Sequence, residues 1–185
     1  GVAAIFNTGD VSVSANYDST GLFAKSLYDV AYINNTGDVS VSSEYGTAAY
    51  GIYASAFGST AVVLNYGGDV SASSYDSDAS AIVSVALNDV TIYNSGDLSA
   101  YSYNGDAIGI VGATTDGNVS IYNIGGSISA ESINGNAYGI YARSTNAGDI
   151  LVANTGDMDV SSENGLAFGI YATTNAGDIS VINYG

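Results

Sequence analysis

Short runs of alternating apolar and small polar residues recur along the whole chain, three of them in every thirty residues or so. The run Val11-Ser12-Val13-Ser14 is typical. Alternation with a period of two indicates half-buried β-strands. Gly, Asn and Asp lie between the runs, where turns need positive φ or bonds from side chains to the backbone. No segment has a sustained helical period, so the pattern predicts an all-β protein.

The runs are organised by a motif, Asn-Thr-Gly-Asp, that first occurs at residues 7–10 and returns in strict or looser form along the chain. The steps between successive motif asparagines are 28, 30, 29, 29, 31 and 29 residues. Self-similarity at a fixed period is the signature of a repeat architecture. We therefore expect residues 1–185 to form a single repeat domain of six tandem repeats of about 29 residues, starting near Asn7, Asn35, Asn65, Asn94, Asn123 and Asn154.

In the first and third runs of each repeat, alternation indicates which residues point inward and which point outward. In the first run the apolar residues, such as Val39 and Val41, are expected inside and the serine between them outside. The third run has apolar residues at its inward positions, such as Val90 and Ile92. By the same parity a column of asparagines ends this run facing inward, where the side-chain amides can bond to one another as a ladder: Asn65, Asn94, Asn123, Asn154 and Asn183.

The second run of each repeat has a pattern that is interrupted by a glycine, seen best in Ala49-Tyr50-Gly51-Ile52-Tyr53-Ala54. Its most regular column, which includes Ile52 and Ile140, is expected inside. The next column then faces outward and is rich in aromatic residues: Phe23, Tyr53, Tyr141 and Tyr171. A glycine column beside them suits a bend, and a bend would reverse the facing of the residues that follow.

Three strands in each repeat of about thirty residues correspond to one coil of a β-solenoid. The predicted fold is an all-β, parallel right-handed β-solenoid (β-helix) of about six coils, with three short strands in each. Parallel strands spaced by ~4.8 Å would give a rod roughly 29 Å long. The alternative, a sandwich of antiparallel hairpins, does not explain why six copies keep the same residue types column by column.

The motifs Gly-Asp-Ile/Val-x-Val, Ala-x-Gly-Ile-Tyr-Ala and Gly-Asp-Ile-x-Val-x-Asn resemble the repeats of autotransporter passenger domains and filamentous-haemagglutinin-type adhesins. The best copies are residues 137–142 with 148–154 and residues 167–172 with 177–183. The resemblance covers the whole chain and implies a secreted bacterial β-helix that is extracellular or exposed on the cell surface. The translocator barrel and capping segment of that family are not found in this sequence.

The amino-acid composition argues against several classes of function. The chain has 18 acidic residues and only Lys25 and Arg143 as basic ones, with a formal net charge of −16. This charge repels nucleic acid and anionic membranes and attracts cations, and no stretch is long and apolar enough for insertion into a membrane. Without His or Cys the usual general bases and activated nucleophiles are absent. We therefore expect no enzyme activity and no organic cofactor.

A calcium ion is the one cofactor that the acidic residues suggest. Alignment of the repeats puts Asp78 over Asp106 in adjacent coils, with Asp76 beside them in the same turn. Carboxylates ~5 Å apart repel each other, which raises a pKa or recruits a cation, and Ca²⁺ binds carboxylate and carbonyl oxygens. The alternative is that these carboxylates are solvated and stabilise the turns in which they lie.

The strands at the two ends of the repeat array have no visible cap, because no Pro, helix or cluster of charges covers them. They contain Val2, Ala4, Ile5 and Phe6 at one end and Ile179, Val181 and Ile182 at the other. The first hypothesis is thus a structural subunit or segment of an extracellular bacterial fibre or surface adhesin, joined head to tail into a homopolymer. The alternative is an adhesin passenger segment whose outward Tyr columns contact glycans or a host protein.

Overall fold

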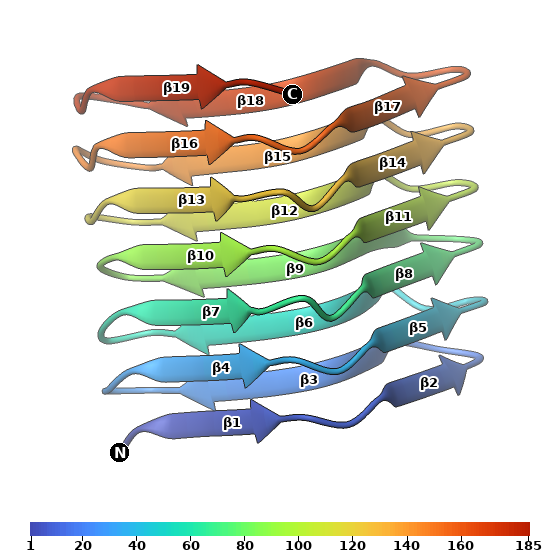
Figure 1. Ribbon diagram of the computed structural model, residues 1–185, viewed down its shortest axis with the longest axis horizontal. Coiled ribbons are helices and arrows are strands. Elements are labelled where there is room, and N and C mark those ends of the chain that lie inside the picture. Colours follow the sequence, from blue (N-terminus) through green and yellow to red (C-terminus); the bar gives the residue numbers. More distant parts are fainter.

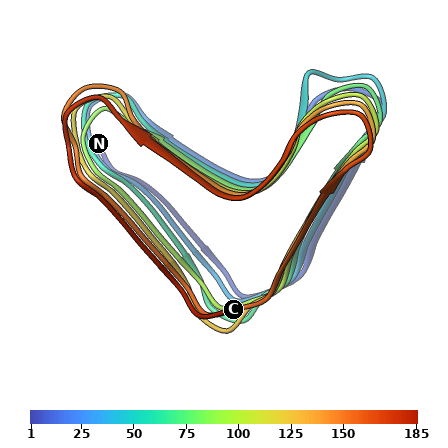
Figure 2. The ribbon, with the colours of Figure 1, turned by 90° about the horizontal axis from the view of Figure 1, so that it is seen from above.

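The computed structural model describes residues 1–185, which form nineteen β-strands and no helix. Successive coils stack along one axis, the rod axis (Figure 1), and the strands of each coil follow one another around a closed outline (Figure 2). This confirms the predicted all-β solenoid with coils of about thirty residues. No helix of a length and hydrophobicity that could cross a membrane is present.

The strands form three parallel sheets, each of which takes every third strand of the chain. Sheet A contains β1 (Ala3–Asn7), β4 (Ala31–Asn35), β7 (Ala61–Asn65), β10 (Val90–Asn94), β13 (Val119–Asn123), β16 (Ile150–Asn154) and β19 (Ile179–Asn183). Sheet B contains β2 (Val11–Ala15), β5 (Val39–Ser43), β8 (Val70–Ser74), β11 (Leu98–Ser102), β14 (Ile128–Ser132) and β17 (Met158–Ser162). Sheet C contains β3 (Ser19–Ser26), β6 (Ala48–Ala56), β9 (Asp78–Ala86), β12 (Ala107–Thr114), β15 (Ala137–Ser144) and β18 (Ala167–Thr174).

Every strand pairs in parallel with the equivalent strand of the next coil, and like residues lie above like. Ile92 of β10, for example, pairs with Val63 of β7 on one side and Ile121 of β13 on the other. The antiparallel sandwich is therefore excluded. Because the register is the same in all three sheets, each column of the sequence becomes a column of stacked side chains along the rod.

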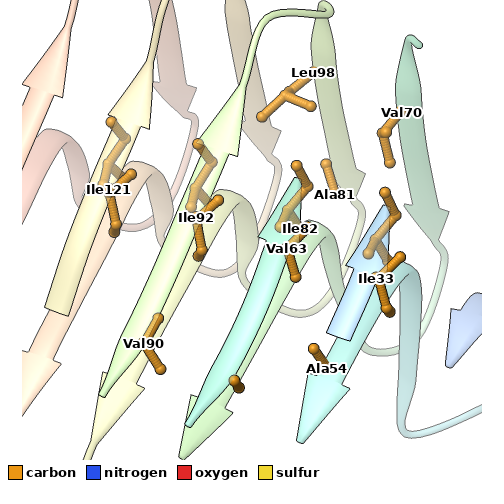
Figure 3. Close-up of a cluster of buried hydrophobic side chains, with 14 of the residues drawn as sticks. Ile33, Ala54, Val63, Val70, Ala81, Ile82, Val90, Ile92, Leu98 and Ile121 are labelled. Carbon is orange, nitrogen blue, oxygen red and sulfur yellow. The ribbon is translucent and has the colours of Figure 1, made fainter. Parts of the chain in front are cut away.

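The inward columns of the three sheets meet in one continuous core. Ile33, Val63, Ile92 and Ile121 follow one another up sheet A and point inward (Figure 3). Leu98 from sheet B lies across the core from them and is also fully buried. Burial of each such side chain contributes about 1.5–3 kcal/mol, so the repeated apolar columns supply most of the stability of the rod.

Sheet C differs from the other two because its strands bend toward the interior halfway along, as Figure 2 shows from above. In β6, Tyr50 and Tyr53 face outward, whereas Gly51 and Ile52 between them are both buried. A Cβ on Gly51 would lie only 2.3 Å from Cγ1 of Val70 in sheet B. Glycine is needed here because a larger residue would collide with the Val70 side chain and with the backbone oxygen of Ala81 in β9, which is 2.6 Å from the same Cβ position. The glycine column thus marks a bend that reverses the facing of the residues after it.

One polar group in the core lacks a partner. The hydroxyl of Ser84 in β9 is buried and makes no hydrogen bond, and the equivalent residue in β6 is Ala54. We expect Ser84→Ala to stabilise the protein by about 1 kcal/mol, because it removes the cost of burying an unpaired hydroxyl. The melting temperature should rise by about 2–4 °C.

The matched control is Ser102→Ala in β11. The Ser102 hydroxyl donates to the backbone oxygen of Ser77 at 2.7 Å and accepts from the backbone N–H of Gly105 at 2.8 Å. This variant should lower the melting temperature. A loss of similar size in both variants would mean that Ser84 has a partner in solution and that our interpretation of its burial is wrong.

Candidate functional site

The corner between sheets A and B is held by an amide ladder that runs the length of the rod. The Nδ2 group of Asn94 donates to Oδ1 of Asn123 in the next coil at 2.7 Å and to the backbone oxygen of Gly96 at 2.6 Å. The same pair of bonds recurs at six asparagines from Asn7 to Asn154. The predicted ladder of Asn65, Asn94, Asn123, Asn154 and Asn183 is therefore confirmed, and it fixes the register of the coils.

A second ladder at the same corner is made by carboxylates. The backbone N–H of Asp38 donates to Oδ1 of Asp10 at 3.1 Å, and Asp69 and Asp97 continue the series at 3.0 Å. Asp97 in turn accepts from both the backbone N–H and the hydroxyl of Ser127, at 2.8 and 2.9 Å. These bonds favour the charged form and hold the pKa of Asp97 below its usual value. The acidic side chains thus tie neighbouring coils together.

The residues predicted to bind calcium also form hydrogen bonds between neighbouring coils. Asp78 does lie next to Asp106 of the adjacent coil, where its Oδ1 accepts from the backbone N–H of Asp106 at 2.9 Å. Asp106 accepts from the backbone N–H of Asn136 at 2.7 Å, and Asp76 accepts from the side chain of Asn104 at 2.9 Å. The structure forms no group of three or more His, Cys, Asp or Glu side chains that could hold a metal ion. Calcium binding stays a prediction.

The outward face of sheet C is concave because its strands bend toward the interior. Between β3 and β6 it contains a pocket of about 260 Å³. Phe23, Tyr50, Tyr53 and Phe57 form its aromatic walls, and the ring centroids of Phe23 and Tyr53 lie 5.4 Å apart, those of Tyr50 and Tyr53 5.0 Å.

Two side chains of opposite charge, Lys25 and Asp18, line this pocket. Lys25, which also lines the pocket, has its Nζ 5.0 Å from the centroid of the Phe57 ring. Asp18 lines the pocket as well, and bonds from the backbone and hydroxyl of Thr47 lower the pKa of its carboxyl. On the aromatic side, burial raises the pKa of Tyr50, with a smaller effect from Tyr53. The pocket therefore combines apolar ring faces with one carboxylate and one ammonium group.

A second aromatic cluster lies farther along the same face. Tyr138 stacks on Phe168 at 5.3 Å, and Tyr141 stacks on Tyr171 at 5.4 Å. The two stacks meet edge to face, with the Tyr138 and Tyr141 centroids 5.5 Å apart. Burial is the main cause of the raised pKa of Tyr138, and Asp106 adds to it. The four rings form one packed patch on the outside of β15 and β18.

The predicted outward column of Phe23, Tyr53, Tyr141 and Tyr171 is present, with valines at the equivalent places in β9 and β12. Sequence reasoning missed the neighbouring aromatic column on the other side of the bend: Tyr50, Tyr138 and Phe168. The signal was available, because an aromatic residue precedes the Gly-Ile pair in three of the six repeats.

Sequence reasoning also missed the arrangement of the two cations. In the register of sheet C, Lys25, Ser55, Val85, Ala113 and Arg143 form one column. Both basic residues of the chain therefore lie on the face that carries the aromatic residues, at the edge of the column Phe23 to Tyr171.

No family model matches this chain. The curated proteins and the solved structures compared with it contain no match either. The resemblance to autotransporter passengers and filamentous-haemagglutinin-type adhesins, and the location that it implies, therefore stay predictions. The same is true of the expected lack of enzyme activity.

The end strands form the last candidate site. Ile179 and Val181 of β19 are each 46% exposed, whereas Ile150 and Val152, which occupy the same columns in β16, are 1% and 0% exposed. Ile182 of β19 faces outward, as its pairing with Ala153 shows. At the other end Ile5 of β1 packs partly against the core, while Val2, Ala4 and Phe6 are exposed. In β1 and β19 the residues of the core columns are therefore less buried than in the inner coils.

Proposed function

We propose that this chain is a structural β-solenoid rod of an extracellular bacterial fibre or surface adhesin, and that rods join end to end. The observation that carries this proposal is the common register of the three sheets, in which each strand stacks in parallel on the equivalent strand of the next coil. In β19 the inward residues Ile179 and Val181 are exposed, whereas their counterparts in every inner coil are buried. A further coil would bury both side chains. It would also pair the open backbone edge of β19, which is a template for another parallel strand.

The asparagine ladder gives the joint a direction. Asn183 accepts from Asn154 and uses Nδ2 only for a 3.2 Å bond to Gly185, so one of its protons is left for a further asparagine. At the opposite end Asn7 donates to Asn35 and Gly9, and its Oδ1 accepts no bond. The two ends are therefore complementary in a head-to-tail contact, in which the Asn183 amide of one copy donates to Asn7 of the next.

The sheets restrict how two copies can meet. Sheet A has seven strands, while sheets B and C have six each. If β1 of one copy stacks on β19 of another, sheet A continues, but sheets B and C each lack one strand in the joining coil. Either the two copies are therefore shifted relative to each other at the joint, or a segment of a neighbouring chain fills the two missing strand positions.

The test is the length of particles in electron micrographs of the purified protein and of the double variant Ile179→Lys with Val181→Lys. Both lysines can reach water in a single rod, but a further coil would bury them as unpaired charges, which costs several kcal/mol. We expect the unmodified protein to form long rods and the variant to form short particles. The control is Ile182→Lys, which places one lysine on the outward side of β19 and should keep the long rods.

Two outcomes would contradict the proposal. Short particles from the unmodified protein would show that the ends do not join. Equally long rods from the double variant would show that the contact uses another surface.

A further inference from the structure

The concave face of sheet C has the properties of a site for an elongated ligand. Its floor follows the bend of the strands, and the rows of outward residues on both sides of the bend run parallel to the rod axis. Aromatic rings line this floor in β3 and β6 and again in β15 and β18. Broad ring faces beside a few polar groups are the composition of a ligand site, and they suit the apolar C–H faces of sugar rings.

The distribution of charge indicates the sign of the ligand. A chain with 18 acidic residues has only two basic ones, and both lie in one column of this face. The side chains of Lys25 and Arg143 are both exposed. Each lies two residues beyond an outward ring of its own strand, Phe23 in β3 and Tyr141 in β15. A carboxylate above either aromatic cluster would therefore lie within reach of a cation, and the resulting bond would be charge-assisted.

The spacing of the two cations indicates the shape of the ligand. Four coil steps separate β3 from β15 in sheet C, which at ~4.8 Å for each step corresponds to about 19 Å along the rod. A single sugar cannot contact both cations, but a short linear chain that carries carboxylates along its length can. The net charge of −16 repels such a chain, and Lys25 and Arg143 are the only basic side chains that attract it, so binding is expected at the column that contains them.

We propose that the concave face of sheet C binds a linear oligosaccharide of uronic acids, with sugar rings on the two aromatic clusters and carboxylates at Lys25 and Arg143. The pocket between β3 and β6 holds one end of the oligosaccharide. There Asp18, which also lines the pocket, accepts hydrogen bonds from sugar hydroxyls. This site is independent of the joining of rod ends.

The experiment measures binding of a galacturonate hexasaccharide and of its fully methyl-esterified form by calorimetry at moderate salt concentration. The acid form should bind about tenfold more tightly than the ester, since esterification removes the charge that Lys25 and Arg143 recognise. Lys25→Gln should weaken binding of the acid form about tenfold and leave binding of the ester unchanged. Tyr53→Ala should weaken both forms about tenfold.

The matched control is Tyr93→Ala. Tyr93 in β10 is an outward tyrosine whose ring lies 5.2 Å from that of Tyr66, but it lies on sheet A. This variant should bind both forms as the unmodified protein does. The variant Ile179→Lys with Val181→Lys should also bind normally, which separates this site from the end contact.

Three results would overturn the proposal: no binding of the acid form, equal affinity for acid and ester, or no effect of Lys25→Gln. If sedimentation shows side-by-side association of rods that Tyr53→Ala abolishes, the face belongs to a second copy of the chain and the oligosaccharide site is wrong. Lys25 is exposed and its loss leaves the fold intact, so the test does not depend on the stability of the tyrosine variants.

Discussion

Ile140→Asp is expected to unfold the rod or reduce its stability to a small remainder. Ile140 is fully buried at the bend of β15, in a column that also contains Ile110 and Ile170. The substitution buries a carboxylate without a partner and leaves a cavity, at a cost of about 4–5 kcal/mol or more. A domain of this size is stable by only about 5–15 kcal/mol in total. The measurement is chemical unfolding followed by circular dichroism.

Ser99→Thr is the control for that experiment. Ser99 is exposed in the outward column of sheet B, and a surface change of this kind alters stability by only about 0.5 kcal/mol. Equal unfolding midpoints for the two variants would contradict the inward placement of the isoleucine column.

Asn94→Ala is expected to produce the second large loss, about 3–5 kcal/mol. The Asn94 side chain is fully buried and takes part in three bonds, to Asn65, Asn123 and Gly96. Its removal leaves the Oδ1 of Asn123 and the backbone oxygen of Gly96 buried without these donors. Thermal unfolding of the variant and the unmodified protein gives the difference.

Asn104→Ala provides an unusually close control, because Asn104 belongs to a similar ladder on the surface. It donates to Asp76 at 2.9 Å and accepts from Asn134 at 3.0 Å, but all three side chains are exposed. Water replaces the lost bonds there, so the cost should stay below about 1 kcal/mol. Similar losses for Asn94→Ala and Asn104→Ala would mean that burial does not strengthen the inner ladder.

Much of this fold could be predicted from the sequence because the repeats stack in register. Each column of residue types became a column in space, so the inward facing of Ile92 and Asn94 followed from alternation alone. The glycine column was also visible in the sequence and indicated a bend. In the structure a side chain at Gly51 would collide with Val70, which explains why glycine is found there. Local period and residue type were sufficient for these features.

The concave face was harder to predict because it depends on what the bend does in three dimensions. Tyr50 and Tyr53 are three residues apart, which in a straight strand would place them on opposite faces. Because Gly51 and Ile52 both turn inward, the two rings meet at 5.0 Å on the same face. The partners of the carboxylates were also beyond the sequence pattern, since Asp78 bonds to the backbone of the next coil.

The coil-to-coil pairing has a consequence for mechanical force. The backbone hydrogen bonds that join neighbouring strands run along the rod axis in all three sheets. Tension applied through the two ends of the chain therefore breaks the hydrogen bonds of the outermost coil one after another. It does not load many hydrogen bonds in shear at the same time. Each coil that peels away releases about 29 residues, or roughly 100 Å of extended chain. A tether built in this way lengthens in steps under load and can wind up again, coil on coil, when the load is removed.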